Sequence, residues 1–198
     1  MKTKTEKKSA KILRLEIVTY LKESKNYILF IFVLFLYLLI AGLILPTPAV
    51  LEEIIKNLLR EIIEKTSGLT TFELIFFIFK NNAFISILGI ILGAFLGIVP
   101  LILTISNGYV LGYVIKLVLK NSSLYHLWRL FPHGIFELPA VIISLGLGLK
   151  LGASLFTANP EKEFLRRFLL SIKILLFLII PLLLIAAMIE GILIKILA

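Results

Sequence analysis

His133 and Glu137 are the two residues of this chain whose types and spacing best suit chemistry. They lie in FPHGIFELPAVIISLGLGLKLG, residues 131–152, a segment that is otherwise mostly apolar. Four residues apart on a helix, an imidazole and a carboxylate share one face, where they can hydrogen-bond, relay a proton or help to hold a metal. Each is costly in an apolar environment without a partner. Three roles stay open: a structural tie for a broken helix, a proton or ion pathway, and a docking surface for another membrane protein.

Three asparagines can act as hydrogen-bond partners for this pair. Asn81 and Asn82 are adjacent in the sequence, and Asn107 interrupts a long apolar run. Because an amide side chain both donates and accepts, it can satisfy a buried imidazole or carboxylate. We therefore expect a polar intramembrane site that comprises Asn81, Asn82, Asn107, His133 and Glu137.

Glu190 and Lys150 also fall within apolar runs, and we expect both at a membrane surface. Glu190 is near the C-terminus, where a solvated pair with Lys195 is the simplest arrangement. Lys150 has a long flexible stem, so its ammonium group is expected to reach the cytoplasmic face.

Residues that several other kinds of site require are missing from the sequence. There is no cysteine, all twelve acidic residues are glutamates, and His126 and His133 are the only histidines. Disulfides, thiolate metal sites, aspartate-based magnesium sites and a histidine-only zinc site within one chain are thereby excluded. No HExxH, GxSxG or phosphate-binding loop motif occurs either. We expect no enzymatic activity and no cofactor, with a metal-dependent intramembrane hydrolase as a distant alternative.

The elements that carry these residues are expected to be membrane helices. The 198-residue chain is 60% hydrophobic and 17% charged, with a mean hydropathy of +1.06. A soluble domain would be roughly 45–50% apolar and about 25% charged. Residues 26–45 form one apolar run, which matches the ~20 residues that cross a bilayer as a helix. The sequence therefore predicts an all-α membrane domain over residues 26–198.

About five spans are expected in this polytopic helix bundle, the first at 26–45 and the last at 169–194. Thr70 and Glu73 form a capping box for a short apolar helix. The middle of the chain is then expected to contain an interruption at 80–82, a span over about 83–105, a turn at 106–108, a short apolar piece at 109–119 and the motif segment 132–153. Pro132 and Pro139 both favour the first turn of a helix, so we expect a broken or re-entrant segment near 132–139.

Residues 48–66 are expected to form an amphipathic helix outside the cytoplasm. In VLEEIIKNLLREIIEK, pairs of apolar and polar residues alternate, which places the apolar side chains in one stripe on a helix. Glu52 with Lys56, and Glu61 with Lys65, are spaced to form ion pairs. This helix is expected to lie on the membrane, on a partner or on the rim of its own protein.

The net charge of +9 includes a basic cluster in residues 1–25, ahead of the first span. Basic residues that flank a span tend to stay in the cytoplasm, and anionic lipid attracts them. We therefore expect a cytoplasmic juxtamembrane arm over 1–25, a multi-pass protein of the cell membrane, and no nucleic-acid partner. Five crossings would place the C-terminus on the opposite side.

Small residues recur at spacings that suit close helix packing. Glycines in a GxxxGxxxG series, and others spaced in the same way, let helix backbones approach one another. We expect self-association through these faces, with a homodimer as the simplest closed form. The glycines expected to serve helix packing are Gly89, Gly93, Gly97, Gly108, Gly112, Gly148 and Gly152.

The same segments carry a family resemblance. KNNAFISILGIILGAFLGIVPLILTISNGYVLGYV at 80–114, followed by the HGxFELPA motif at 133–140, resembles the stage II sporulation protein M family, with the similar core covering about residues 80–155. In spore-forming bacteria, the member of this family is a membrane component of a complex that directs cell-wall hydrolases during engulfment.

Two functions are compatible with these features. The resemblance implies a scaffold or subunit of a membrane complex, with other membrane or envelope proteins as partners beside the lipid bilayer. The alternative is a transporter or permeation protein, in which the polar residues around His133 and Glu137 form an intramembrane site.

Overall fold

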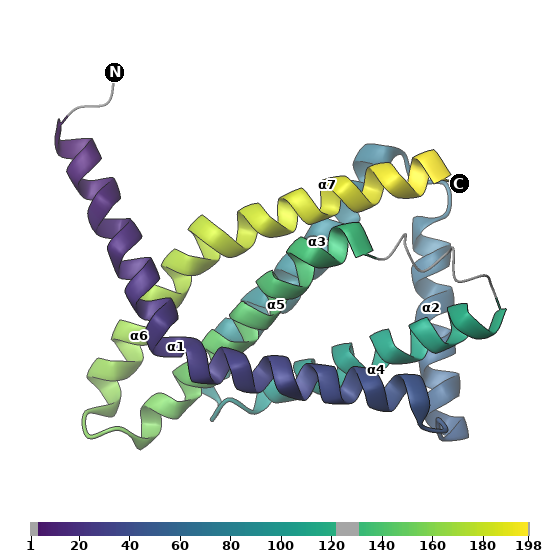
Figure 1. Ribbon diagram of the computed structural model, residues 1–198, viewed down its shortest axis with the longest axis horizontal. Helices are drawn as coiled ribbons and strands as arrows, with labels where there is room; N and C mark the ends of the chain where they lie inside the picture. The colour runs from purple at the N-terminus through teal and green to yellow at the C-terminus, as the bar shows by residue number, and fades with distance from the viewer. Residues whose placement is uncertain (1–3, 122–130, 198) are drawn as a thin grey trace.

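The computed structural model describes residues 4–121 and 131–197, and in them the chain forms long α-helices that pack side by side (Figure 1). In chain order the helices are α1 (Lys4–Ile44), α2 (Ala49–Thr66), α3 (Thr71–Ile91), α4 (Ile98–Asn121), α5 (Phe131–Gly152), α6 (Pro160–Ile174) and α7 (Ile180–Leu197). A π-helical turn, Leu175–Ile179, joins α6 to α7 without a break. No strand occurs in these residues, so the expected all-α class is confirmed.

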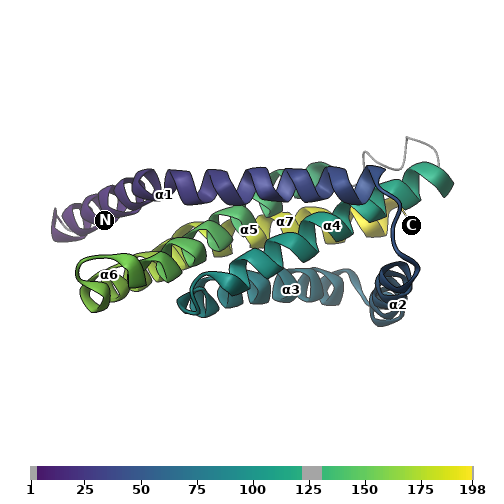
Figure 2. The same cartoon turned by 90° about the horizontal axis from the view of Figure 1, so that it is seen from below.

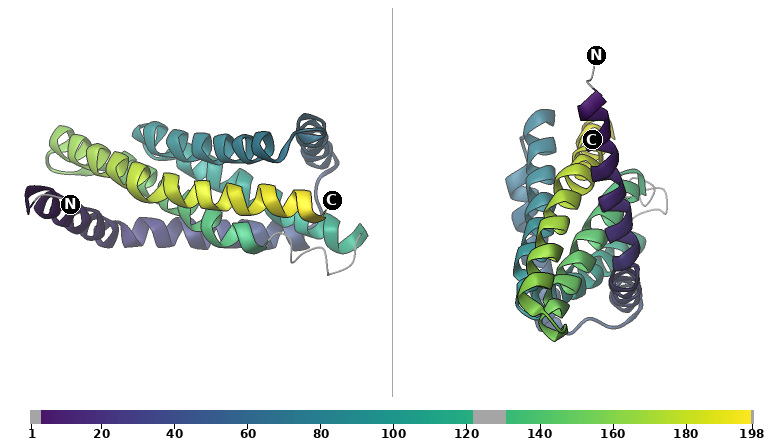
Figure 3. Two further views of the ribbon diagram at one scale, coloured as in Figure 1. Left: turned by 90° about the horizontal axis from the view of Figure 1, so that it is seen from above. Right: turned by 90° about the vertical axis from the view of Figure 1, so that its left-hand side faces the viewer.

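Five described segments are long and apolar enough to cross a membrane, as expected. They are Lys11–Ile44, Thr71–Ala94, Ile98–Lys120, Gly134–Phe156 and Pro160–Ile194. The last span encloses the expected run 169–194, and the first covers the expected run 26–45 except its final residue. Together the five segments form a polytopic bundle whose N- and C-termini lie at opposite ends (Figure 3).

The boundaries expected in the middle of the chain were wrong. α3 passes without interruption through Lys80–Asn82, and α4 passes through Asn107, where a turn was expected. The chain instead turns within the glycine series, where Leu96 and Gly97 have positive φ angles of 55° and 74°. Glycine adopts this backbone conformation at little cost. Asn107 is tolerated inside α4 because its side-chain amide donates to the Leu103 carbonyl at 2.7 Å.

The break expected near residues 132–139 is not present. α5 runs continuously from Phe131 to Gly152 with Pro139 inside it. A proline removes one helical hydrogen bond and leaves the carbonyl four residues earlier without its donor. Transmembrane helices accommodate such positions when neighbouring groups or local adjustments satisfy the backbone, and here the helix continues through the motif.

α2 is the expected amphipathic helix, and it lies across one end of the bundle. Its axis runs roughly perpendicular to the spans, at the end where α1 finishes and α3 begins (Figures 1 and 2). Gly68, with φ of 86°, follows its C-terminus. The capping box of α3 is also confirmed: the Thr70 hydroxyl accepts from the Glu73 backbone N–H at 3.4 Å, and the Glu73 carboxylate accepts from the Thr70 backbone N–H at 2.8 Å.

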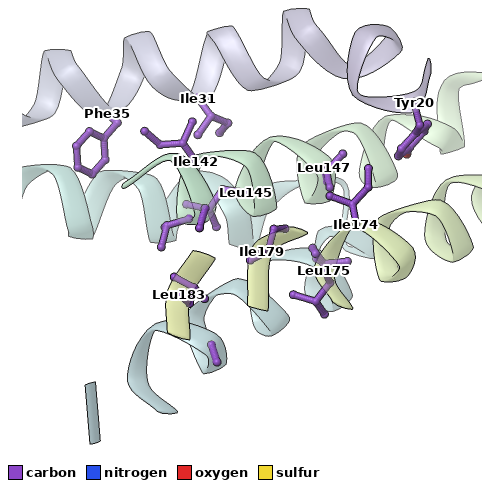
Figure 4. Packing of buried hydrophobic residues seen from close by; sticks show 14 residues of the cluster. Tyr20, Ile31, Phe35, Ile142, Leu145, Leu147, Ile174, Leu175, Ile179 and Leu183 are labelled. Carbon is purple, nitrogen blue, oxygen red and sulfur yellow. The ribbon is translucent and has the colours of Figure 1, made fainter. Parts of the chain in front are cut away.

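α5 is the central helix of the bundle. It contacts α1, α3, α4, α6 and α7, and 67% of its apolar stretch is buried, against 17–33% for the other spans. Ile142, Leu145 and Leu147 of α5 extend into the core, where they meet side chains from α1 and from the α6–α7 segment, such as Ile31 and Ile179 (Figure 4). Most residues of α5 from Ala140 to Lys150 are therefore held inside the protein, whereas residues 134–139 are half-buried or exposed.

Candidate functional site

A polar cavity lies where α3, α4 and α5 meet. It has a volume of about 200 Å³, and Asn82, Asn107 and Glu137 contribute its polar lining. The remaining lining residues are apolar side chains of α1, α3, α4 and α5. Three of the five residues expected to form a polar intramembrane site thus share one cavity, although they come from three different helices.

Asn82 connects this cavity to the outer face of α3. Its side chain is only 8% exposed and lines the cavity together with the Glu137 carboxyl group. The neighbouring Asn81 is exposed, and its amide donates to the Asn82 side-chain oxygen at 3.5 Å. Asn81 therefore does not line the cavity, but it contacts Asn82, which does.

Glu190 of α7 is a member of this region that the sequence analysis assigned elsewhere. It was expected as a solvated residue of the membrane edge, but it is half-buried and interacts electrostatically with Glu137. The next residue, Gly191, lies so close to α3 that an added Cβ would overlap the side chain of Ile75. The signal available in the sequence was a carboxylate inside an apolar run, directly followed by a glycine that could allow close helix packing.

His133 belongs to the first turn of α5, but its side chain lies outside the part of the chain that the structure describes. The expected pair of His133 with Glu137 is therefore not described. Among the described residues, no group of three or more carboxylates and histidines is placed to hold a metal.

The chemistry available in the cavity follows from one carboxyl group, that of Glu137, and the two amides of Asn82 and Asn107. A carboxyl group in a medium of low polarity favours either a bound proton or a neighbouring cation. The amides of Asn82 and Asn107 can donate to oxygen or accept from nitrogen. The arrangement suits a proton, a cation, or a small group rich in hydroxyl or amino hydrogens.

A second polar cluster, which the sequence analysis did not expect, lies at the opposite end of α5. Lys150 is only 4% exposed, and its ammonium nitrogen lies 3.9 Å from the centre of the Tyr20 ring, 3.1 Å from Ser24 Oγ and 3.4 Å from a Glu23 carboxylate oxygen. Arg166 also pairs with Glu23, at 3.2 Å. Lys150 was expected to reach the cytoplasmic face, but it is buried among residues of α1 and α6.

The expected packing glycines lie at contacts between helices of this same chain. A Cβ on Gly148 would overlap the Gly89 carbonyl, and a Cβ on Gly112 would overlap the Leu39 carbonyl of α1. Similar close contacts surround Gly93, Gly97, Gly108 and Gly152. Because these faces are occupied within the chain, they are not available for contact between two copies.

Comparisons with known proteins agree with the membrane fold. A family model described as Stage II sporulation protein M matches residues 27–193. An uncharacterized protein of Methanocaldococcus jannaschii, MJ0706, is 34% identical over 125 residues, which cover 60% of this chain and 55% of that relative. The match thus spans about half the length of this relative. No solved structure matches the chain.

Proposed function

This chain belongs to the stage II sporulation protein M family, and we propose that it acts as a scaffold or subunit of a membrane complex. The family match and the five apolar spans make it a multi-pass membrane protein. The proposed role is non-enzymatic: the chain would hold other membrane or envelope proteins in place.

The observation that carries this proposal is the apolar stripe of α2. Ile55 packs inward and is only 2% exposed, whereas another row of apolar side chains on α2 has no cover from the described residues of the chain. This row is spaced four residues apart, the pattern by which a helix presents anchors to a partner. The exposed row consists of Val50, Ile54, Leu58 and Ile62.

Self-association as a homodimer belongs to the same proposal. The glycine faces are occupied within the chain, so the α2 stripe is the surface we propose for contact with a second copy or with another protein. A large exposed apolar patch is typical of an interaction site.

The charge distribution supports a cytoplasmic N-terminus. The basic arm of α1 lies at the same end of the bundle as Arg166 and Arg167 of α6 (Figure 1), and basic segments favour the cytoplasmic side. Because the chain has no cysteine, a single cysteine at Lys11 or at Glu64 can be labelled in intact cells. We expect a membrane-impermeant maleimide to label only the cysteine at position 64. Labelling at position 11 instead would show that the N-terminus lies outside the cytoplasm.

Affinity purification from native membranes in mild detergent tests the scaffold role. We expect the wild type to recover a stoichiometric partner or a second copy, and Ile54→Glu or Leu58→Glu to lose it. Asn57→Glu adds the same charge on the exposed polar side of α2 and should retain the partner. A wild-type chain that stays monomeric, with no partner cross-linked in native membranes, would contradict the proposal.

The polar cavity favours a second candidate, the transport or permeation of a proton or a small cation. Glu137 is not tightly packed, because it lines the 200 Å³ space with Asn82 and Asn107. In liposomes, Glu137→Gln would then abolish flux while leaving the fold intact, and Glu161→Gln on the exposed start of α6 would not. Equal flux through the wild type and Glu137→Gln would rule out this candidate.

A further inference from the structure

A groove on the side of the bundle runs between α1 and α5. It encloses about 600 Å³, and its walls are eight residues of α1 from Leu21 to Leu39 and four residues of α5 from Leu138 to Ile143. Every lining residue is apolar except Lys25. The groove is therefore an apolar cleft with one cationic side chain, that of Lys25, near one end.

No carboxylate in the described part of the chain pairs with Lys25. It is exposed, whereas the cations of the neighbouring α1–α5–α6 cluster are neutralised by glutamates. The ion pairs there are Lys150 and Arg166 with Glu23, Arg166 and Arg167 with Glu163, and Lys173 with Glu16. The mouth of the groove thus keeps a positive charge that can attract an anion.

The position of Lys25 along the bundle suits a lipid headgroup. The preceding residue, Ser24, accepts a hydrogen bond from Lys150, which lies two residues before the end of α5. From Lys25 to Leu39 the groove follows α1 for about 21 Å, at 1.5 Å per residue. One leaflet of a ~30 Å hydrocarbon core is about 15 Å deep, so a chain anchored at Lys25 stays in the groove through its leaflet.

The volume of the groove is large enough for a hydrocarbon chain but too small for an α-helix. A helix about 10 Å across would fill roughly 1,600 Å³ over 21 Å of its length, far more than the 600 Å³ enclosed here. A transmembrane helix would therefore rest on the rim of the groove, whereas a hydrocarbon chain can enter it.

We propose that the α1–α5 groove is a binding site for one anionic phospholipid, with an acyl chain between the two helices and the phosphate on the ammonium group of Lys25. Phe35 and Leu138 line both this groove and the polar cavity. The bound chain would therefore lie directly against the wall of the region that contains Glu137.

Native mass spectrometry of the full chain in detergent tests the site, with phosphatidylglycerol and phosphatidylcholine as probes. We expect one phosphatidylglycerol to bind more tightly than phosphatidylcholine, and Lys25→Ala to weaken its binding about fivefold, the effect of one lysine near an anionic headgroup. Lys22→Ala is the matched control, since Lys22 is exposed on the same helix but does not line the groove.

A second pair of variants tests the acyl chain. Leu29 lines the groove and is exposed, so Leu29→Trp should fill the groove and block lipid binding. Val33 is similarly exposed but lies outside the groove, so Val33→Trp should bind lipid normally. Equal losses from Lys25→Ala and Lys22→Ala would overturn the proposal, as would unchanged binding by a folded Leu29→Trp. A groove that is closed by a second copy of the chain, with no lipid preference, would overturn it as well.

Discussion

The two polar regions along α5 differ in how their charges are compensated. At the N-terminal end of the bundle, Lys150 is enclosed by the Tyr20 ring, the Ser24 hydroxyl and the Glu23 carboxylate. Toward the other end, Glu137 shares its surroundings with a second carboxylate, Glu190, and with the amide of Asn82. The first region pairs a buried cation with a carboxylate, whereas the second places the Glu137 carboxyl group beside a cavity that is lined by amides and apolar side chains.

This difference separates a structural role from a functional one. Opposite charges with satisfied hydrogen bonds hold helices in register, and removing one partner leaves the other uncompensated. A carboxyl group that is partly buried beside a cavity is held there at a cost to stability, and such sites are common where a proton or a ligand is handled. We therefore regard the Lys150 cluster as a clamp between α1, α5 and α6, and the Glu137 region as the candidate for activity.

The largest effect is expected from a change that disturbs both regions at once. Gly148 lies between them on α5, and a Cβ there would overlap the backbone of Gly89 in α3. Because backbone cannot move aside cheaply, Gly148→Ala should cost about 3 kcal/mol or prevent folding. Thermal unfolding in detergent measures the loss. Gly134→Ala on the same helix, where the Cβ meets only Leu138 Cδ1 at 3.9 Å, should fold at least as well as the wild type; equal losses would mean that the close contact is unimportant.

The next effect tests the clamp. Glu23→Ala removes the carboxylate that faces the buried ammonium group of Lys150 and also pairs with Arg166. We expect a loss of about 2 kcal/mol, below the range for fully buried pairs because Glu23 is partly exposed. Glu16→Ala is the matched control on the same helix: Glu16 pairs with the exposed Lys173, so the loss should stay below about 1 kcal/mol. Similar losses for both would show that the Lys150 cluster is no clamp.

Many of the elements and polar residues of these two regions could be predicted from the sequence, because they depend on local patterns. The spans followed from hydropathy, α2 from its apolar stripe, and the capping box from Thr70 and Glu73. Asn82, Asn107 and Glu137 were recognised because polar residues in apolar runs require partners. These inferences did not need to know which helices are neighbours.

The remaining features depend on tertiary contacts. A turn between two apolar helices leaves little trace in hydropathy, so the reversal at Leu96 and Gly97 was missed and Asn107 was taken for a turn. Pro132 and Pro139 were both considered as helix starts, and the structure places Pro139 inside α5. Lys150 and Glu23 are 127 residues apart, and no local pattern indicates that they meet.

A smaller effect, of opposite sign, is expected in the Glu137 region. Glu137→Gln keeps the shape and the hydrogen-bonding capacity of the side chain but removes one of two interacting carboxylates. We expect unchanged stability or a gain of up to about 1 kcal/mol, since the neutral amide does not have to be desolvated as a charge. Thermal unfolding measured beside Glu23→Gln gives the contrast, because the latter should destabilise. A clear loss of stability in Glu137→Gln would mean that this carboxylate is a structural tie rather than a site.

The smallest effect on stability is expected from the ion pairs of α2, which are exposed to water rather than enclosed in the bundle. On α2, the hydrogen bond and charge of Lys56 lower the pKa of Glu52, and Lys65 lowers the pKa of Glu61 in the same way. Because the folded pKa values lie below the unfolded value of about 4.3, these pairs stabilise α2 above that pH and lose their effect as the pH falls through the lowered pKa values. Backbone amide NMR shifts of α2 between about pH 6 and pH 3 should show a slight loss of helix at the acid end.

A Glu52→Gln/Glu61→Gln variant, or high salt, should flatten this response, because exposed pairs are weak and screened. If the wild type and the double variant respond alike, the pairs contribute nothing, and the compensation that matters in this protein is confined to the enclosed cluster around Lys150.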